Sequence, residues 1–243
     1  MIQTDFLSII FCSIILLYAC YSDIKTRTVS NKLWLLSIAV SMPLIIYNIF
    51  LFDMSYLIAL VISISLTTIL AYLFFRLGSF GGADAKSLIC IAILIPTNHI
   101  NSVFNPFPFA ITTLINASII SLITLLLMFF YNLWNLEFNE FIKNLKMVFI
   151  GYKIHINTLT IKKHVWLLHS YNEDITNKKV IPKGVELNNK IIEQLKEYAI
   201  QSKLDKVWVT PKLPYMLFIT SGFFISLFYG NLVIYIINYI FIS

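Results

Sequence analysis

Six long apolar stretches dominate the hydrophobic pattern of the chain. They cover approximately residues 6–22, 33–51, 56–75, 87–97, 109–131 and 213–242. A helix that crosses a bilayer needs about 20 mainly apolar residues, and most of these stretches have that length. The stretch 87–97 is shorter, which suits a helix shielded by its neighbours, whereas 213–242 is too long for one span and is interrupted at Gly230-Asn231. We therefore predict six transmembrane helices, the sixth followed by a short or re-entrant membrane helix.

The segment 132–212 differs from the rest because it is polar and rich in lysine. Within it, Val165–Ser170 and Lys206–Val209 have the composition of short strands. The segment Asn188–Gln201 is typical of an amphipathic helix, with apolar residues on one side at Ile191, Ile192, Leu195 and Tyr198. The pattern predicts an α-helical membrane protein with a small cytoplasmic α+β domain between helices five and six. The expected domains are residues 1–131, 132–212 and 213–243.

Composition agrees with a membrane protein and argues against a soluble globular one. Hydrophobic residues make up 58% of the chain and charged residues only 12%, with a mean hydropathy of +0.81. That leaves too little polar surface to cover a soluble domain. The first five residues carry no basic segment, so we expect the first apolar stretch to be a retained helix and not a cleaved signal peptide. Cys12, Cys20 and Cys90 lie inside apolar stretches without C-x-x-C spacing, so we expect packing residues and no disulfide or zinc framework.

The basic residues predict the orientation in the membrane. Lys25, Arg27 and Lys32 lie between the first two apolar stretches, and Arg76 and Lys86 lie beside the junction of the third and fourth. All the remaining lysines lie in 143–212, and the alternate connections carry none. Because basic loops stay on the cytoplasmic side, we expect both termini outside the cytoplasm. The polar segment could also contact anionic lipid headgroups.

Two aspartates are the strongest candidates for chemistry. Asp23 directly follows the first apolar stretch, where a carboxylate opposes the helix dipole, so its position needs another explanation. A surface ion pair with Lys25 or Arg27 is the simplest alternative. Asp84 follows Gly81-Gly82-Ala83 just before the fourth stretch, where a role as helix N-cap is the alternative.

The predicted topology places Asp23 and Asp84 at the same cytoplasmic edge of the membrane. Two carboxylates at close range do not both ionise comfortably, so one keeps a proton while the other is ionised. The ionised group can take a proton from water while the protonated group polarises a peptide carbonyl. The pair titrates as a unit, so neither residue receives a fixed role. The two residues are thus a candidate pair for peptide hydrolysis.

Several motifs resemble the type IV prepilin peptidase family, the GxGD-type aspartyl peptidases of membranes, and most of all its archaeal preflagellin peptidases. They are Tyr21-Ser22-Asp23 with Arg27, Val29 and Asn31; Gly81-Gly82-Ala83-Asp84-Ala85-Lys86; Phe107-Pro108-Phe109-Ala110-Ile111-Thr112 with Asn116; and Trp208-Val209-Thr210-Pro211-Lys212-Leu213-Pro214 with Gly222 and Gly230-Asn231. The second glycine of GxGD is Ala83 here, which keeps a small residue beside the aspartate. The polar segment before residue 206 adds little to the resemblance.

The resemblance implies that the substrates are precursors of archaellin or of related pilin-like proteins. It implies cleavage at the cytoplasmic face, between a short basic leader and an apolar helix, with Asp23 and Asp84 catalytic. No metal and no cofactor are implied, and no nucleic-acid partner is expected. The four histidines, His99, His155, His164 and His169, show no metal spacing. Since the polar segment has no cysteine, we expect peptidase activity without the N-methylation that bacterial relatives often add.

Supporting roles are proposed for a few neighbours of the two aspartates, beginning with the small residues Gly81, Gly82 and Ala83, which allow a close approach to Asp84. Lys86 could tune Asp84 or bind a substrate carboxylate, with membrane anchoring as the alternative. Arg27 and Asn31 could fix the loop that holds Asp23, although Asn31 also suits the cap of the second helix.

The rival function is a proton- or ion-coupled transporter, since carboxylates within membranes often carry ions. That function favours acids at the bilayer midplane and internal repeat symmetry. Here both acids are predicted at one edge, and the two halves do not resemble each other. A non-catalytic scaffold, with both aspartates as helix caps, is a further alternative.

Overall fold

The computed structural model describes residues 2–97, 107–159, 165–170, 179–202 and 205–242. The chain divides into two compact units. The first comprises Met1–Ser121 together with Pro214–Ser243, and the second comprises Leu122–Leu213. Each is described separately below.

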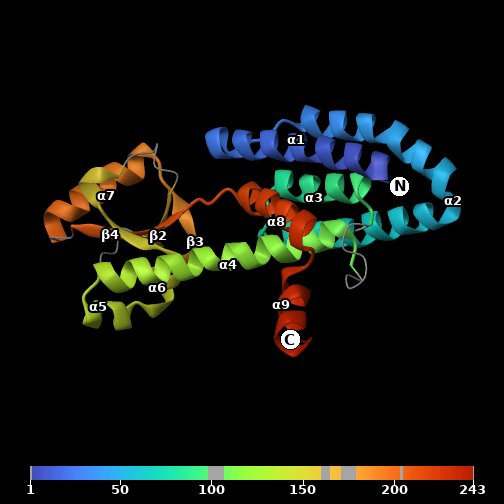
Figure 1. The fold of residues 1–243 in the computed structure, drawn as a ribbon. Helices are drawn as coiled ribbons and strands as arrows, with labels where there is room; N and C mark the ends of the chain where they lie inside the picture. Colours follow the sequence, from blue (N-terminus) through green and yellow to red (C-terminus); the bar gives the residue numbers. More distant parts are fainter. Residues whose placement is uncertain (1, 98–106, 160–164, 171–178, 203–204, 243) are drawn as a thin grey trace. The chain divides into compact units, whose positions relative to one another are not determined.

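The first unit is helical (Figure 1). Its helices are α1 (Ile2–Thr26), α2 (Asn31–Arg76), α3 (Gly82–Leu94), the first part of α4 (Phe109–Asn135), α8 (Tyr215–Tyr229) and α9 (Leu232–Ile242). These helices follow the predicted apolar stretches closely. The break between α8 and α9 lies at Gly230-Asn231, as expected from the sequence.

Helix α2 is longer than predicted. The stretches 33–51 and 56–75 were expected as separate helices, but they lie in one continuous helix of 46 residues. No glycine or proline occurs between Pro43 and Arg76, so nothing in the chain interrupts the backbone hydrogen bonds. Figure 1 shows that α2 bends back along its length. In the middle of α2, Asn48 Nδ2 donates to the Tyr56 hydroxyl at 3.4 Å.

The lengths and apolar character of the helices confirm a multi-pass membrane protein at the coarse level. In the described part of the chain, four helical segments are long and apolar enough to cross a bilayer: Phe6–Thr26, Asn31–Phe52, Met54–Arg76 and Phe109–Asn135. Helices α8 and α9 meet at an angle of 43° and add a fifth if they form one broken span. Helix α3 has only 13 residues, which is too few to cross alone.

The core of the first unit is built around α3, which packs against α1, α2 and α8. Leu88 and Ile91 of α3 are fully buried, as are Ile219 and Phe223 of α8. Helices α4 and α8 approach closely because Gly222 has no side chain. A Cβ at Gly222 would lie 2.6 Å from the Thr113 carbonyl oxygen and 2.7 Å from the Ala117 backbone nitrogen. The resemblance had drawn attention to Gly222, and this contact gives its physical reason.

Asn116 joins α4 to the break between α8 and α9. Its Nδ2 donates to Ser226 Oγ at 2.9 Å and to the Gly230 carbonyl at 2.8 Å, and its Oδ1 accepts from the Leu232 N–H at 3.0 Å. Gly230 has a φ of 72°, a conformation that glycine adopts readily. Asn231 then caps α9, since its Oδ1 accepts from the Val233 N–H at 3.0 Å. A buried amide therefore satisfies the backbone groups that the break exposes.

The second unit contains a four-stranded antiparallel sheet with the order β1-β4-β2-β3. The strands are β1 (Tyr152–His155), β2 (Val165–Ser170), β3 (Lys179–Glu186) and β4 (Lys206–Pro211); the helices are the end of α4, α5 (Phe138–Lys143), α6 (Leu145–Ile150), the 3-10 turn η1 (Ile156–Thr158) and α7 (Asn189–Ser202). The structure confirms the predicted strands β2 and β4 and the helix α7, whereas β1 and β3 were not predicted.

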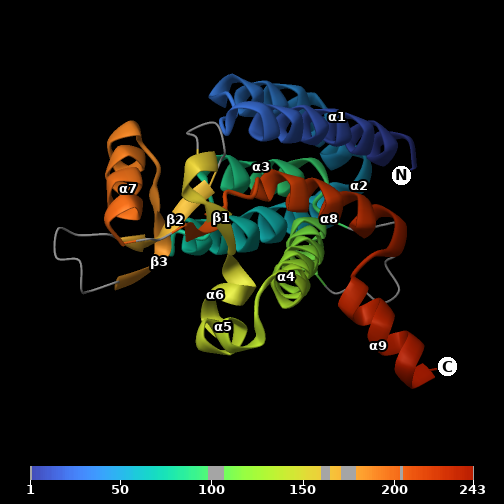
Figure 2. The same cartoon turned by 90° about the vertical axis from the view of Figure 1, so that its left-hand side faces the viewer.

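Helix α7 covers the sheet with its apolar side (Figure 2). Ile192 and Leu195 of α7 are buried against Val165, Val207 and Val209 of the strands. This burial is the reason for the amphipathic pattern seen in the sequence.

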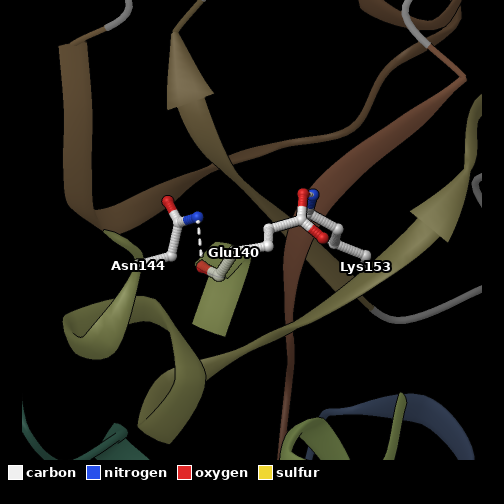
Figure 3. A network of polar contacts seen from close by, with 3 residues as sticks. All are labelled: Glu140, Asn144 and Lys153. Atoms are coloured by element: carbon white, nitrogen blue, oxygen red, sulfur yellow. Dashed lines mark hydrogen bonds and ion pairs between the residues drawn. The ribbon is translucent and has the colours of Figure 1, made fainter. Parts of the chain in front are cut away.

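A polar contact joins α5 to the edge strand β1 (Figure 3). Glu140 forms an ion pair with Lys153, and the Asn144 side chain donates to the Glu140 carbonyl at 2.9 Å. The Lys153 ammonium also lies over the Trp208 ring, 5.6 Å from its centre. The second unit therefore has an apolar core with ion pairs at its surface. Among the described residues, the first unit also has an apolar core but no ion pair.

Candidate active site

Asp23 lies in the last turn of α1, and the residues around it fix how the chain leaves this helix. Arg27 follows with a φ of 57°, and its N–H donates to the Asp23 carbonyl at 3.0 Å. Ser22 Oγ donates to the Thr28 carbonyl at 2.8 Å. The left-handed residue and the hydroxyl bond close the turn after Asp23, so its carboxylate belongs to an ordered helix end and not to a loose loop.

The Asp23 carboxylate is half-buried and interacts with the Arg27 charge and with the Met216 backbone N–H in the first turn of α8. The alternative of a surface ion pair is not supported, because among the described residues no ion pair involves Asp23. Lys25 instead donates to the Tyr21 hydroxyl at 3.4 Å. Arg27 Nε is buried and has no hydrogen-bond partner within the described residues. A donor is thus left available next to Asp23.

Asp84 is the third residue of α3 and is only 7% exposed. Asp84 is not the N-cap itself, as the cap alternative expected, because Gly81 is the N-cap and Asp84 is the third residue after it. Its Oδ2 accepts from the Gly81 N–H at 2.8 Å. An acid in the first turn also interacts favourably with the helix dipole. The carboxylate is therefore oriented by the backbone that precedes its own helix.

The two carboxylates are close enough for their charges to interact. Neither lies beside a basic side chain at ion-pair distance in the described part of the chain. Two neighbouring acids without an ion-pair partner favour a shared proton, because ionising both would place two negative charges together. This coupling is the arrangement that acid–base chemistry by two carboxylates requires.

Sequence reasoning missed the first turn of α8, which borders both aspartates. Met216 approaches Asp23, and the Tyr215 side chain interacts electrostatically with Asp84. The Tyr215 hydroxyl bonds to Ser118 and Ser121 of α4. Its ring lies 5.0 Å from that of Phe80, which directly precedes Gly81. The available signal was Pro214, since a proline before an apolar run often marks a helix start.

Two supporting residues are joined in an unexpected way. Asn31 was expected to cap the second helix, but Ser30 is the cap, and its Oγ accepts from the Lys32 N–H at 3.3 Å. Asn31 Oδ1 instead accepts from Lys86 Nζ at 2.6 Å. This bond joins the first turns of α2 and α3. The Lys86 ammonium therefore binds an amide oxygen and not a carboxylate.

The small residues before Asp84 differ in what they touch. A Cβ at Gly81 would lie 3.2 Å from Asp84 Oδ2, whereas a Cβ at Gly82 would meet open space. Ala83 packs against the core of the first unit. Only Gly81 therefore needs to be glycine for the sake of the Asp84 carboxylate.

Comparison with protein families gives the assignment. Residues 10–126, which include both aspartates, match the type IV leader peptidase family. Residues 143–232 match the type II C-terminal region of archaeal A24 peptidases. The chain belongs to the type IV leader peptidase family.

Relatives of this leader peptidase match along nearly the whole length. A preflagellin peptidase of Methanocaldococcus jannaschii is 26% identical over 235 residues, covering 90% of this chain and 92% of that protein. A preflagellin peptidase of Methanococcus voltae is 28% identical over 234 residues, covering 91% and 94%. A third, from Methanococcus maripaludis, is 24% identical and covers 89% and 92%. The leader peptidase thus resembles these proteins in both of its units.

Within the described residues of this leader peptidase, no group of three or more histidine, cysteine or acidic side chains is placed to hold a metal ion. The three cysteines are free and buried. Cys90 donates to Ser37 Oγ at 2.8 Å and so contributes to packing between α3 and α2.

Proposed function

We propose that this protein is a membrane aspartyl endopeptidase that removes the leader peptide from a preflagellin or a related pilin-like precursor. The observation that carries the proposal is the interaction between the carboxylates of Asp23 and Asp84, within the segment that matches the leader peptidase family. Relatives called preflagellin peptidases, similar over about nine tenths of the chain, support the substrate class. The comparisons give no support to the transporter alternative.

The reaction follows from the pair of acids. The ionised carboxylate removes a proton from a water molecule, and that water attacks the peptide carbonyl carbon. The protonated carboxyl group donates to the carbonyl oxygen as negative charge develops there. The pair then returns a proton to the leaving amine. Asp23 and Asp84 are the proposed catalytic residues, and either can begin as the acid.

Neighbouring residues have proposed roles in holding the pair. The Gly81 N–H orients Asp84, and the Met216 N–H and Arg27 face Asp23. The unpartnered Arg27 Nε, among the described residues, is a donor that a substrate carbonyl could use. The site acts through protein side chains and water.

The orientation of the site is also a proposal. Lys25, Lys32 and Arg76 lie at the same helix ends as the two aspartates, which favours the cytoplasmic face. We infer six membrane helices with both termini outside the cytoplasm. Helix α3 enters the bilayer only partly, shielded by α1, α2 and α8. Residues 132–212 would then form the cytoplasmic domain, between the membrane parts 1–131 and 213–243.

A cleavage assay tests the proposal. Membranes containing the protein would be mixed with a tagged preflagellin, and leader removal would be followed by the shift in size. Asp23→Asn and Asp84→Asn should each lower the rate by about 10²–10⁴-fold, the contribution of a positioned acid or base. Asp205→Asn, an exposed acid in the second unit, is the matched control and should cleave normally. Cleavage that survives either of the first two changes would remove that aspartate from catalysis.

A further inference from the structure

A cavity of about 400 Å³ lies between α3 and the first part of α2. Its apolar walls include Trp34, Leu35 and Ile38 of α2 and Ile89 and Ile93 of α3. This volume falls within the range of about 300–1,000 Å³ that is usual for ligand sites. The cavity is therefore large enough for part of a small amphipathic molecule.

The cavity is separate from the catalytic pair. Lys86 lines it, whereas Asp84, only two residues earlier, is buried on another side of α3. Each residue turns an α-helix by about 100°, so these two side chains leave α3 in nearly opposite directions. The walls at Ile89 and Ile93 continue along the Lys86 side. A molecule bound here would not occupy the peptidase site.

One end of the cavity is polar and cationic. Lys86 and Asn31, which are hydrogen-bonded to each other at 2.6 Å, both line it and lie in the first turns of their helices. Trp34, which also lines the cavity, has its indole N–H buried without a partner among the described residues. Within the described part of the chain, no carboxylate forms an ion pair with Lys86. This end therefore offers one positive charge.

The remaining walls are apolar for about two helical turns, from Lys86 to Ile93. Leu35 and Ile38 at the rim are 67% and 40% exposed. On the proposed topology, the cationic end lies at the level of the lipid headgroups and the apolar walls lie deeper. A phospholipid has its charge and its chains at those two depths, whereas a purely apolar helix would bring no anion to Lys86.

We propose that this cavity binds an anionic phospholipid, with its phosphate on Lys86 and one acyl chain between α2 and α3. The lysine gives the site a preference for anionic over neutral headgroups. The apolar walls select a hydrocarbon chain. The inference does not depend on the peptidase activity, and its test does not use cleavage.

Trp34 provides a direct reporter of the bound chain. The purified full-length protein would be placed in mixed micelles with increasing amounts of lipid whose acyl chains carry bromine, which quenches nearby tryptophan. Phosphatidylglycerol would be the anionic probe and phosphatidylcholine the neutral one. The Trp34 signal is the part of the fluorescence that Trp34→Phe removes. Quenching of this part should need about fivefold less anionic than neutral lipid, the preference that one well-placed lysine gives.

Two variants decide the result. Lys86→Met should abolish the preference, whereas Lys32→Met, an exposed lysine at the same helix end that does not line the cavity, should keep it. Circular dichroism would show that both variants are folded, and Ile93→Phe, which fills the cavity, should reduce quenching by both lipids. Equal quenching by the two lipids in the wild type, or a preference that survives Lys86→Met, would overturn the proposal. A Trp34 signal that neither lipid quenches would also overturn it and would indicate a protein segment in the cavity.

Discussion

The two helix ends that carry Asp23 and Asp84 hold the same chemical group in opposite ways. Asp84 lies at the start of α3, is nearly fully buried and accepts the Gly81 N–H. Asp23 lies at the end of α1, is half-buried and depends on neighbours from outside its own helix, including Met216 of α8. A carboxylate suits the first position and opposes the helix dipole at the second. The comparison teaches that Asp84 also supports its local fold, whereas the local fold gives no reason for an acid at Asp23, which the proposed catalytic role would supply.

The largest expected effect comes from displacing α8, whose first turn borders both aspartates. Gly222→Val places a side chain against the α4 backbone, where even a Cβ would lie 2.6 Å from Thr113 O. The clash should push α8, and Met216 with it, away from its neighbours and lower stability by about 3 kcal/mol. Thermal unfolding in detergent would measure this. Gly82→Ala, whose Cβ meets open space, should unfold like the wild type. Equal stability of Gly222→Val and Gly82→Ala would contradict the close contact between Gly222 and the α4 backbone.

The second prediction compares alanine with asparagine at each aspartate. Asparagine at position 84 keeps an oxygen for the Gly81 N–H, whereas alanine leaves that donor unpaired. Asp84→Ala should therefore be about 1 kcal/mol less stable than Asp84→Asn. Asp23→Ala and Asp23→Asn should differ by less than this, because Asp23 is only half-buried and water can replace its bond to the Met216 N–H. Unfolding curves of the four variants give the difference in stability between alanine and asparagine at each position. Equal differences at positions 84 and 23 would show that the two aspartates do not differ in their support of the fold.

A smaller effect is expected from moving the Asp84 carboxylate slightly. In Gly81→Ala the new Cβ would lie 3.2 Å from Asp84 Oδ2, so the carboxylate must shift by a few tenths of an ångström. A displacement of about 1 Å can lower a rate by roughly 10²-fold, so we expect a loss of a few-fold here. The cleavage assay measures it. Gly82→Ala is again the control, and a similar loss in both variants would show that the distance to Oδ2 is not the cause.

The smallest effect concerns a carboxylate far from this chemistry in sequence, Glu186. Its exposed side chain pairs with Lys212 at 2.5 Å, and that hydrogen bond lowers the pKa of Glu186 below its ordinary value. The pair therefore adds stability above the ordinary pKa of a glutamate, and this is lost as pH falls through the lowered value. Exposed pairs contribute little. Lys212→Met should unfold like the wild type at pH 7, with leader cleavage unchanged; slow cleavage would connect this pair to the site.

Sequence patterns predicted the parts of the structure that depend on local composition. The apolar stretches gave the helices, and the basic residues placed Asp23 and Asp84 at one edge, where the structure shows their charges interacting. The strands β2 and β4 were found, but β1 is short and β3 lacks clear alternation of apolar and polar residues. The two spans expected in 33–51 and 56–75 agree with the candidate spans Asn31–Phe52 and Met54–Arg76, but a helical bend and not the expected loop joins them.

Contacts between distant segments could not be predicted in this way. The bond from Lys86 to Asn31 joins residues 55 positions apart, so the local pattern suggested a cap at Asn31 instead. The same limit applies to Met216 and Tyr215, whose approach to the aspartates depends on how α8 packs against α1 and α3. The motif residues were recognisable, but the groups that orient them come from other helices.

The backbone at Arg27 sets a limit on how this sequence can drift during evolution. Its φ of 57° is one that glycine and asparagine adopt readily and that costs other residues about 1–2 kcal/mol. Mutation to either of those residues would relieve the backbone while removing the positive charge that interacts with Asp23. The side chain and the main chain at this position therefore favour different residues. A chain with glycine or asparagine here would have a more relaxed turn and would need another donor beside the aspartate.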